Sequence, residues 1–170
     1  MNQDYKIYQL LGDFDQYQLQ EIKFGLNQGL DVSHYADTRF DYRQMRQIRY
    51  GLESGLDVSW YADPKFSWHQ MFEIRYGLRS GVDVSIYASP RFTWQQMRQI
   101  RYGLEAKIDV SYYADPSFSA DQMGEIRLGL EDGLDVSQYA DPKLSWERMS
   151  EIRYDLLTGT VESKSMEIVR

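Results

Sequence analysis

The sequence predicts an all-α protein, an α-solenoid of five 26-residue helix–turn–short-helix repeats with capping segments at the N- and C-termini. Three observations support this fold: the chain copies itself at a fixed interval, each copy opens with a helix-capping pattern, and each copy closes in a short turn segment. The repeats run 14–39, 40–65, 66–91, 92–117 and 118–143. We expect residues 1–13 to form an N-terminal cap and 144–170 to hold a partial sixth repeat and the C-terminal cap, all in a single domain.

The first part of each repeat predicts a helix of about 12–14 residues. In repeat 66–91, Ser67 and Gln70 form a capping box, and Phe66 with Met71 has the spacing of a hydrophobic staple. Gly81 supplies a left-handed residue at the end of the helix. The apolar stripe of this helix comprises Trp68, Met71, Ile74 and Leu78. The capping box recurs as Asp41 with Gln44, Thr93 with Gln96 and Ser119 with Gln122.

The second part of each repeat predicts a short helix of one or two turns, of α or 3₁₀ type. Asp83 can cap it, Val84 and Tyr87 give it an apolar side, and Pro90 ends it. A strand is the alternative, but the alternation of apolar and polar residues is poor.

A glycine stands inside each long helix, at Gly25, Gly51, Gly77, Gly103 and Gly129. Each costs about 1 kcal/mol relative to alanine, so we expect close approach between helices, with a moving hinge as the alternative. Lys107 replaces the glycine that ends the other long helices, and its turn should be strained or altered. At the far end, Asp155 replaces the helix glycine and residues 158–160 break the pattern.

Composition narrows the function classes. The net charge of −7 and a pI near 4.8 argue against nonspecific binding to nucleic acid or to acidic membranes. No apolar run approaches the length of a membrane span, and cysteine is absent, so we expect a cytoplasmic protein with no disulfide, metal or cofactor. The two histidines, His34 and His69, occupy different repeat positions, and no catalytic constellation stands out, so we expect no enzyme.

Charges also recur at fixed positions. We expect a structural ladder of Arg–Asp pairs, or of arginines that cap carbonyl groups between repeats; a basic stripe for phosphate is the alternative. The ladder's arginines are Arg49, Arg75, Arg101 and Arg127, continued by Lys23 and Arg153, and its aspartates are Asp57, Asp83, Asp109 and Asp135, preceded by Asp31.

An aromatic residue recurs on the long helices, about 140° around the helix from the core methionine, and should face away from the core. This aromatic ladder comprises Phe24, Tyr50, Tyr76, Tyr102 and Tyr154, and Leu128 interrupts it. Tyr and Arg are frequent interface anchors, so we predict a partner-binding face made of Tyr50, Phe72, Tyr76, Tyr102, Arg46 and Arg98. A variable position in the short segment adds Trp60 and Tyr112. The alternatives are that the short helices cover the ladder and that the variable position merely tolerates change.

Residues 44–59 and 61–64 resemble a short repeat found in poorly characterised proteins of bacterial phages and conjugative elements, and the resemblance covers about residues 14–157. It implies a mobile-element context, in which small acidic proteins inhibit host defences, as anti-CRISPR and anti-restriction proteins do. The first hypothesis is therefore a noncatalytic protein-binding solenoid whose partner is a bacterial defence nuclease. The second is a nucleic-acid binder that uses the ladder's basic residues with Arg43, Arg46, Arg91 and Arg98; the third, an enzyme, would need a pocket near His69.

Overall fold

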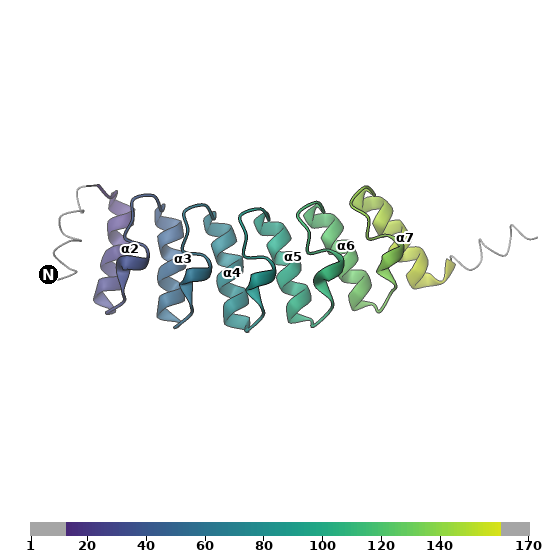
Figure 1. Ribbon diagram of the computed structural model, residues 1–170, viewed down its shortest axis with the longest axis horizontal. Helices are drawn as coiled ribbons and strands as arrows, with labels where there is room; N and C mark the ends of the chain where they lie inside the picture. Colours follow the sequence, from purple (N-terminus) through teal and green to yellow (C-terminus); the bar gives the residue numbers. More distant parts are fainter. Residues whose placement is uncertain (1–12, 161–170) are drawn as a thin grey trace, which may run out of the picture. The chain divides into compact units, whose positions relative to one another are not determined.

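The computed structural model describes residues 13–160 and confirms an α-solenoid built from helical repeats (Figure 1). The predicted N-terminal cap, apart from residue 13, and the last ten residues of the C-terminal cap lie outside the described residues. The long helices are α2 (Gln16–Asn27), α3 (Tyr42–Glu53), α4 (Trp68–Ser80), α5 (Trp94–Glu105), α6 (Ala120–Glu131) and α7 (Trp146–Thr158). The short ones are 3₁₀ helices: η1 (Val32–His34), η2 (Val58–Trp60), η3 (Val84–Ile86), η4 (Val110–Tyr112) and η5 (Val136–Gln138). No strand occurs among residues 13–160, so the short segment is the 3₁₀ helix and not the strand.

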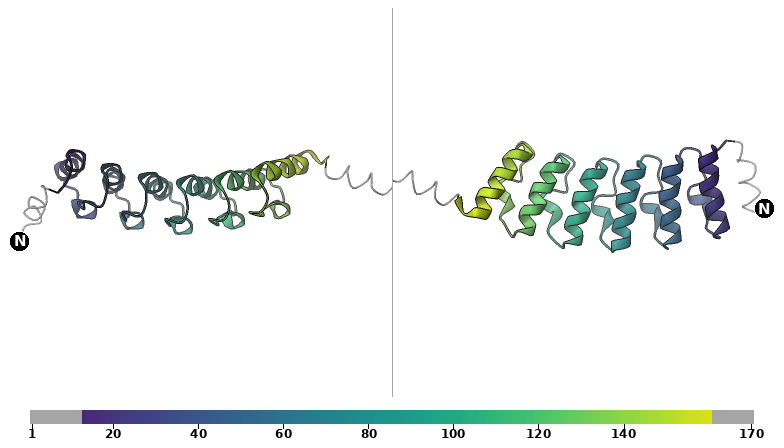
Figure 2. Two further views of the ribbon diagram at one scale, coloured as in Figure 1. Left: turned by 90° about the horizontal axis from the view of Figure 1, so that it is seen from above. Right: turned by 180° about the vertical axis from the view of Figure 1, so that it is seen from behind.

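The chain divides into two compact units, one that ends at Pro90 and one that begins at Arg91. The first contains α2 to α4 with η1 to η3, and the second contains α5 to α7 with η4 and η5. Within each unit, consecutive long helices pack side by side, and each 3₁₀ helix packs on the long helix before it. Each unit therefore has a layer of long helices and a layer of 3₁₀ helices, which Figure 2 shows from above.

The predicted caps are confirmed. Ser67 accepts a hydrogen bond from the Gln70 N–H, and the Gln70 side chain accepts one from the Ser67 N–H at 2.7 Å. Phe66 and Met71, at the positions of the staple, are both buried. Of the predicted stripe, Met71 and Ile74 are fully buried, whereas Trp68 and Leu78 are half-buried.

The glutamine of the capping box also links successive repeats. Gln44 Nε2 donates to the Phe66 carbonyl at 2.6 Å, and Gln122 Nε2 donates to the Leu144 carbonyl at 2.5 Å. A glutamate could accept the N-cap hydrogen bond but could not donate to the next repeat. The link therefore explains why the box uses glutamine in the five complete copies.

The interior glycines admit the 3₁₀ helix that follows and the tyrosine just after it, so the predicted close approach between helices is confirmed: a Cβ on Gly51 would lie 2.9 Å from Val58 in η2. A Cβ on Gly51 would lie 1.9 Å from the Tyr61 hydroxyl oxygen, and Tyr61 is fully buried. That hydroxyl donates to the Gln47 carbonyl at 3.3 Å, inside α3. The same Tyr–Gly contact recurs at Gly25, Gly77, Gly103 and Gly129. In the sixth copy the glycine and the tyrosine are lost together, since Asp155 and Ser165 occupy the two positions.

The turn after each long helix keeps one geometry. Gly81 has φ +73°, and Lys107 has φ +59°, so Lys107 adopts the left-handed conformation instead of altering the turn. Gly159 has φ +71° and ends α7 in the same way. The expected break at 158–160 was therefore wrong for the long helix, which the sixth copy retains in full. Each helix between residues 13 and 160 falls short of the length and apolarity that crossing a membrane requires.

Candidate partner-binding face

The aromatic ladder lies on the side of the long helices that faces away from the 3₁₀ layer. Gly51 meets the 3₁₀ layer through Tyr61 and Val58, whereas Tyr50 is 37% exposed. In the second unit, Tyr102 is 40% exposed. The alternative that the short helices cover the ladder is therefore wrong for these two residues. In each unit, we call this side of its long-helix layer the outer face.

Arginines hold the ladder from below by cation–π contacts. In the first unit, the Arg49 guanidinium carbon lies 5.4 Å from the centre of the Phe24 ring and 4.6 Å from that of Tyr50. Arg75 continues the series at 5.5 Å from Tyr50 and 5.1 Å from Tyr76. In the second unit, the Tyr102 ring lies between Arg101 at 4.6 Å and Arg127 at 5.7 Å. Each such contact contributes about 0.5–2 kcal/mol, so the rings are held in fixed positions before any partner arrives.

The prediction of Arg–Asp pairs was wrong, because the ladder's arginines bond to Glu and Gln side chains of the preceding long helix. Arg49 donates to Glu21 at 2.9 Å, Arg75 to Gln47 at 3.0 Å and Arg127 to Gln99 at 2.9 Å. Each partner stands 28 positions earlier, on the preceding long helix, because side-by-side packing brings these two positions into register. Arg49, Arg101 and Arg127 also form ion pairs with a glutamate four residues later in their own helix.

The ladder's aspartates lie at the other layer, where they cap the 3₁₀ helices. Asp57 accepts hydrogen bonds from the Ser59 N–H and hydroxyl, and these bonds lower the pKa of its carboxyl. The equivalent caps are Asp83, Asp109 and Asp135. An aspartate in this role is exposed and cannot reach the arginines beneath the outer face.

The electrostatics of the buried arginines differ with the partner on the preceding helix. Burial alone would lower the pKa of Arg49, but the Glu21 and Glu53 carboxylates outweigh it, and the pKa rises. Arg75 has neutral Gln47 in place of Glu21, and burial lowers its pKa. Because Arg49, Arg75 and Arg101 are all buried, these three members of the predicted basic stripe are covered by the aromatic residues above them.

The remaining predicted residues divide between the two layers. Arg46 and Phe72 are half-buried on the outer face: Arg46 donates to Glu21 at 2.8 Å, and Phe72 packs on Tyr76 with ring centres 4.4 Å apart. Phe72, which was predicted for the partner-binding face, is therefore only partly exposed. Arg98 lies 4.5 Å from the centre of the Trp94 ring. Trp60 and Tyr112, 42% and 43% exposed, belong to the 3₁₀ layer, so the structure does not bring them together with the outer face.

A second aromatic row was missed by the sequence reasoning. The first residue of the long helices is Tyr42, Trp68, Trp94 or Trp146 in four of the six copies. Tyr42 lies 5.2 Å from the Tyr17 ring, and Arg43 lies 5.9 Å from the Trp68 ring. The recurrence of an aromatic residue directly after the N-cap was the available signal, but Trp68 was assigned to the core.

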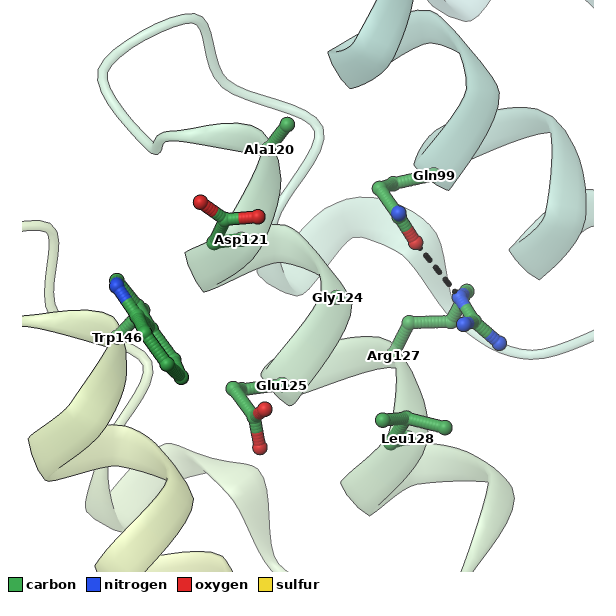
Figure 3. A pocket seen from close by; sticks show the side chains of 8 residues that line it. All are labelled: Gln99, Ala120, Asp121, Gly124, Glu125, Arg127, Leu128 and Trp146. Atoms are coloured by element: carbon green, nitrogen blue, oxygen red, sulfur yellow. Dashed lines mark hydrogen bonds between the residues drawn. The ribbon is translucent and has the colours of Figure 1, made fainter.

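The outer face is hollowed at the fifth repeat, in the second unit. Ala120, Gly124 and Leu128 stand where the second to fourth repeats carry Tyr or Trp, Arg or Phe, and Tyr. The resulting pocket of about 320 Å³ is also lined by Trp146 and by the carboxylates Asp121 and Glu125 (Figure 3). The symmetry of the repeats is thus broken at α6. At His69, where a pocket would have suited an enzyme, the imidazole stacks on Trp68 with ring centres 3.5 Å apart.

Residues 13–160 contain no group of three His, Asp or Glu side chains placed to hold a metal ion. The chain matches no protein-family model, no curated protein and no solved structure.

Proposed function

We propose that this chain is a noncatalytic protein-binding solenoid and that its outer face contacts the partner. The main support for this proposal is the ladder of aromatic rings, which are partly exposed yet held in place by buried arginines. Rigid, amphipathic rings contribute large contact area at low entropic cost. Tyr50 and Tyr102 are the central candidates in their respective units.

The resemblance to phage and conjugative-element repeats supports a bacterial defence nuclease as the first partner class to test, with action in the host cytoplasm. The nucleic-acid alternative is less well supported, because three of the arginines that would supply its phosphate contacts, Arg49, Arg75 and Arg101, are buried.

The experiment compares the two layers. The chain is used to isolate its partner from a bacterial host lysate, and the affinity for the identified partner is then measured for Tyr50→Ala, Tyr102→Ala and their combination. We expect the double variant to bind at least about ten-fold more weakly, which corresponds to about 1.4 kcal/mol. Circular dichroism verifies that each variant is folded.

The matched control is Trp60→Ala with Tyr112→Ala, which removes similarly exposed aromatics from the 3₁₀ layer. These substitutions should leave the affinity unchanged. An affinity that falls for the control pair and not for the outer-face pair would refute the assignment.

A further inference from the structure

The pocket at the fifth repeat has defined chemistry. Ala120, Gly124 and Leu128 give it a low apolar floor, and the Trp146 indole borders it from α7. Figure 3 shows the Asp121 and Glu125 carboxylates on α6, on the side toward Trp146. An aromatic ring next to carboxylates is an environment suited to a flat cation.

The first unit shows which group occupies the same environment between α2 and α3. There the Glu21 carboxylate accepts from two arginines: Arg46 on Oε1 at 2.8 Å and Arg49 on Oε2 at 2.9 Å. The Arg46 guanidinium also lies 5.5 Å from the centre of the Tyr42 ring. The carboxylate and the ring together hold this guanidinium.

Four repeats later the same positions recur, with one replacement. Glu125 stands for Glu21, Trp146 for Tyr42 and Arg153 for Arg49, but Ser150 stands where Arg46 would be. Arg153 Nε donates to Glu125 Oε2 at 2.8 Å, as Arg49 does to Glu21. Glu125 Oε1, the counterpart of the oxygen that Arg46 uses, accepts no hydrogen bond from any described residue.

We propose that this pocket receives an arginine side chain of the protein partner. Its guanidinium takes the place that Arg46 has in the first unit: it donates to Glu125 Oε1 and lies over the Trp146 ring, with Asp121 as a second carboxylate. Arginine suits the site better than lysine because its planar fork both stacks on an aromatic ring and donates two hydrogen bonds. The inference rests on the proposed function, since it assigns the partner's contact on the same outer face.

The test uses a single blocked arginine, N-acetyl-arginine amide, as the probe at low ionic strength. The protein has four tryptophans, so the ¹⁵N-labelled chain gives four indole N–H resonances, and Trp146→Phe identifies the one that matters. We expect a saturable shift of the Trp146 resonance with a dissociation constant on the order of millimolar. The citrulline analogue, which has the same shape and no charge, should bind at least about ten-fold more weakly.

Two substitutions locate the binding site. Ser150→Arg supplies the chain's own guanidinium and should weaken probe binding at least about ten-fold, whereas Ser150→Ala should leave it unchanged. Glu125→Gln should weaken it similarly and stay folded, because Gln99 already accepts from Arg127 at the equivalent position, at 2.9 Å.

Equal binding of the arginine and citrulline probes, shifts confined to the other three indoles, or a Ser150→Arg variant that binds as well as the wild type would each overturn the inference. The assay needs no partner protein. Its failure would therefore leave the outer-face proposal standing, while failure of that proposal would appear in the alanine series.

Discussion

The helix α6 contains two glycines whose substitution by alanine should have opposite effects on stability. Alanine favours a helix over glycine by about 1 kcal/mol at either position. At Gly124, the nearest atoms to an added Cβ belong to the Gln99 side chain, 3.8 Å away, which is an ordinary contact. Gly124→Ala should therefore raise the free energy of unfolding by up to about 1 kcal/mol.

At Gly129, the added Cβ would lie 1.8 Å from the hydroxyl oxygen of buried Tyr139. Displacing the tyrosine costs about 1–3 kcal/mol of overpacking. It also breaks the hydrogen bond to the Glu125 carbonyl at 3.3 Å, which contributes about 1 kcal/mol. After the gain in helix propensity, Gly129→Ala should lower the free energy of unfolding by about 1–3 kcal/mol.

Urea unfolding followed by circular dichroism measures both effects, and the two variants should differ by about 1–4 kcal/mol. Tyr139→Phe provides the coupling test: it removes the clashing oxygen but leaves the ring carbon 3.1 Å away, so it should recover part of the loss caused by Gly129→Ala. If Gly129→Ala stabilises the protein as much as Gly124→Ala, or if Tyr139→Phe recovers nothing, the Tyr–Gly contact does not explain the recurring glycine.

Three further predictions concern stability and use the same urea assay. Gln47→Glu should raise the free energy of unfolding by about 1–2 kcal/mol, because it gives buried Arg75 a carboxylate partner, as Glu21 is for Arg49. A destabilised variant would contradict the role of position 47 as the partner of Arg75. Lys107→Gly should stabilise the protein by about 0.5–1 kcal/mol, because glycine adopts φ +59° without strain, and an unchanged urea midpoint would show that the lysine is unstrained there. Burial raises the pKa of Tyr139 to about 12, so the folded state favours the neutral phenol. The contribution of Tyr139 to the free energy of unfolding is complete below the unfolded pKa, near 10, and is lost as the pH rises from 10 through 12. Tyr139→Phe should therefore reduce the loss of stability at alkaline pH.

Local structure could be predicted from the sequence because its causes lie within a few residues. The Ser67–Gln70 capping box, the left-handed Gly81 and the short 3₁₀ helix after Asp83 all follow from spacing and side-chain chemistry. The 26-residue interval then specifies the solenoid, because each copy can bury its apolar stripe only against its neighbours.

Contacts between repeats could not be derived in the same way. The partner of Arg75 depends on the angle and offset at which α3 and α4 pack, and these bring Gln47 and not an aspartate within reach. The Tyr–Gly contact also joins residues from different elements. Its signal was nevertheless present in the sequence, since the glycine and the tyrosine ten positions later disappear together in the sixth copy.

The candidate site was predicted in part. The exposure of Tyr50 and Tyr102 on the outer face follows from their angle on the helix. The roles of Arg46 and Arg98 depend on side-chain contacts that periodicity does not specify. The hollow at α6 could have been anticipated, because Ala120, Gly124 and Leu128 all lose bulk on one face of one helix.

Site-specific photo-crosslinking shows directly whether the partner contacts the outer face. A photoreactive phenylalanine analogue replaces Tyr50 or Tyr102 on the outer face, and Trp60 or Tyr112 on the 3₁₀ layer, where exposure is similar. We expect one protein from the host lysate to crosslink to the two outer-face positions and to neither position on the 3₁₀ layer. Crosslinks confined to positions 60 and 112 would contradict this expectation.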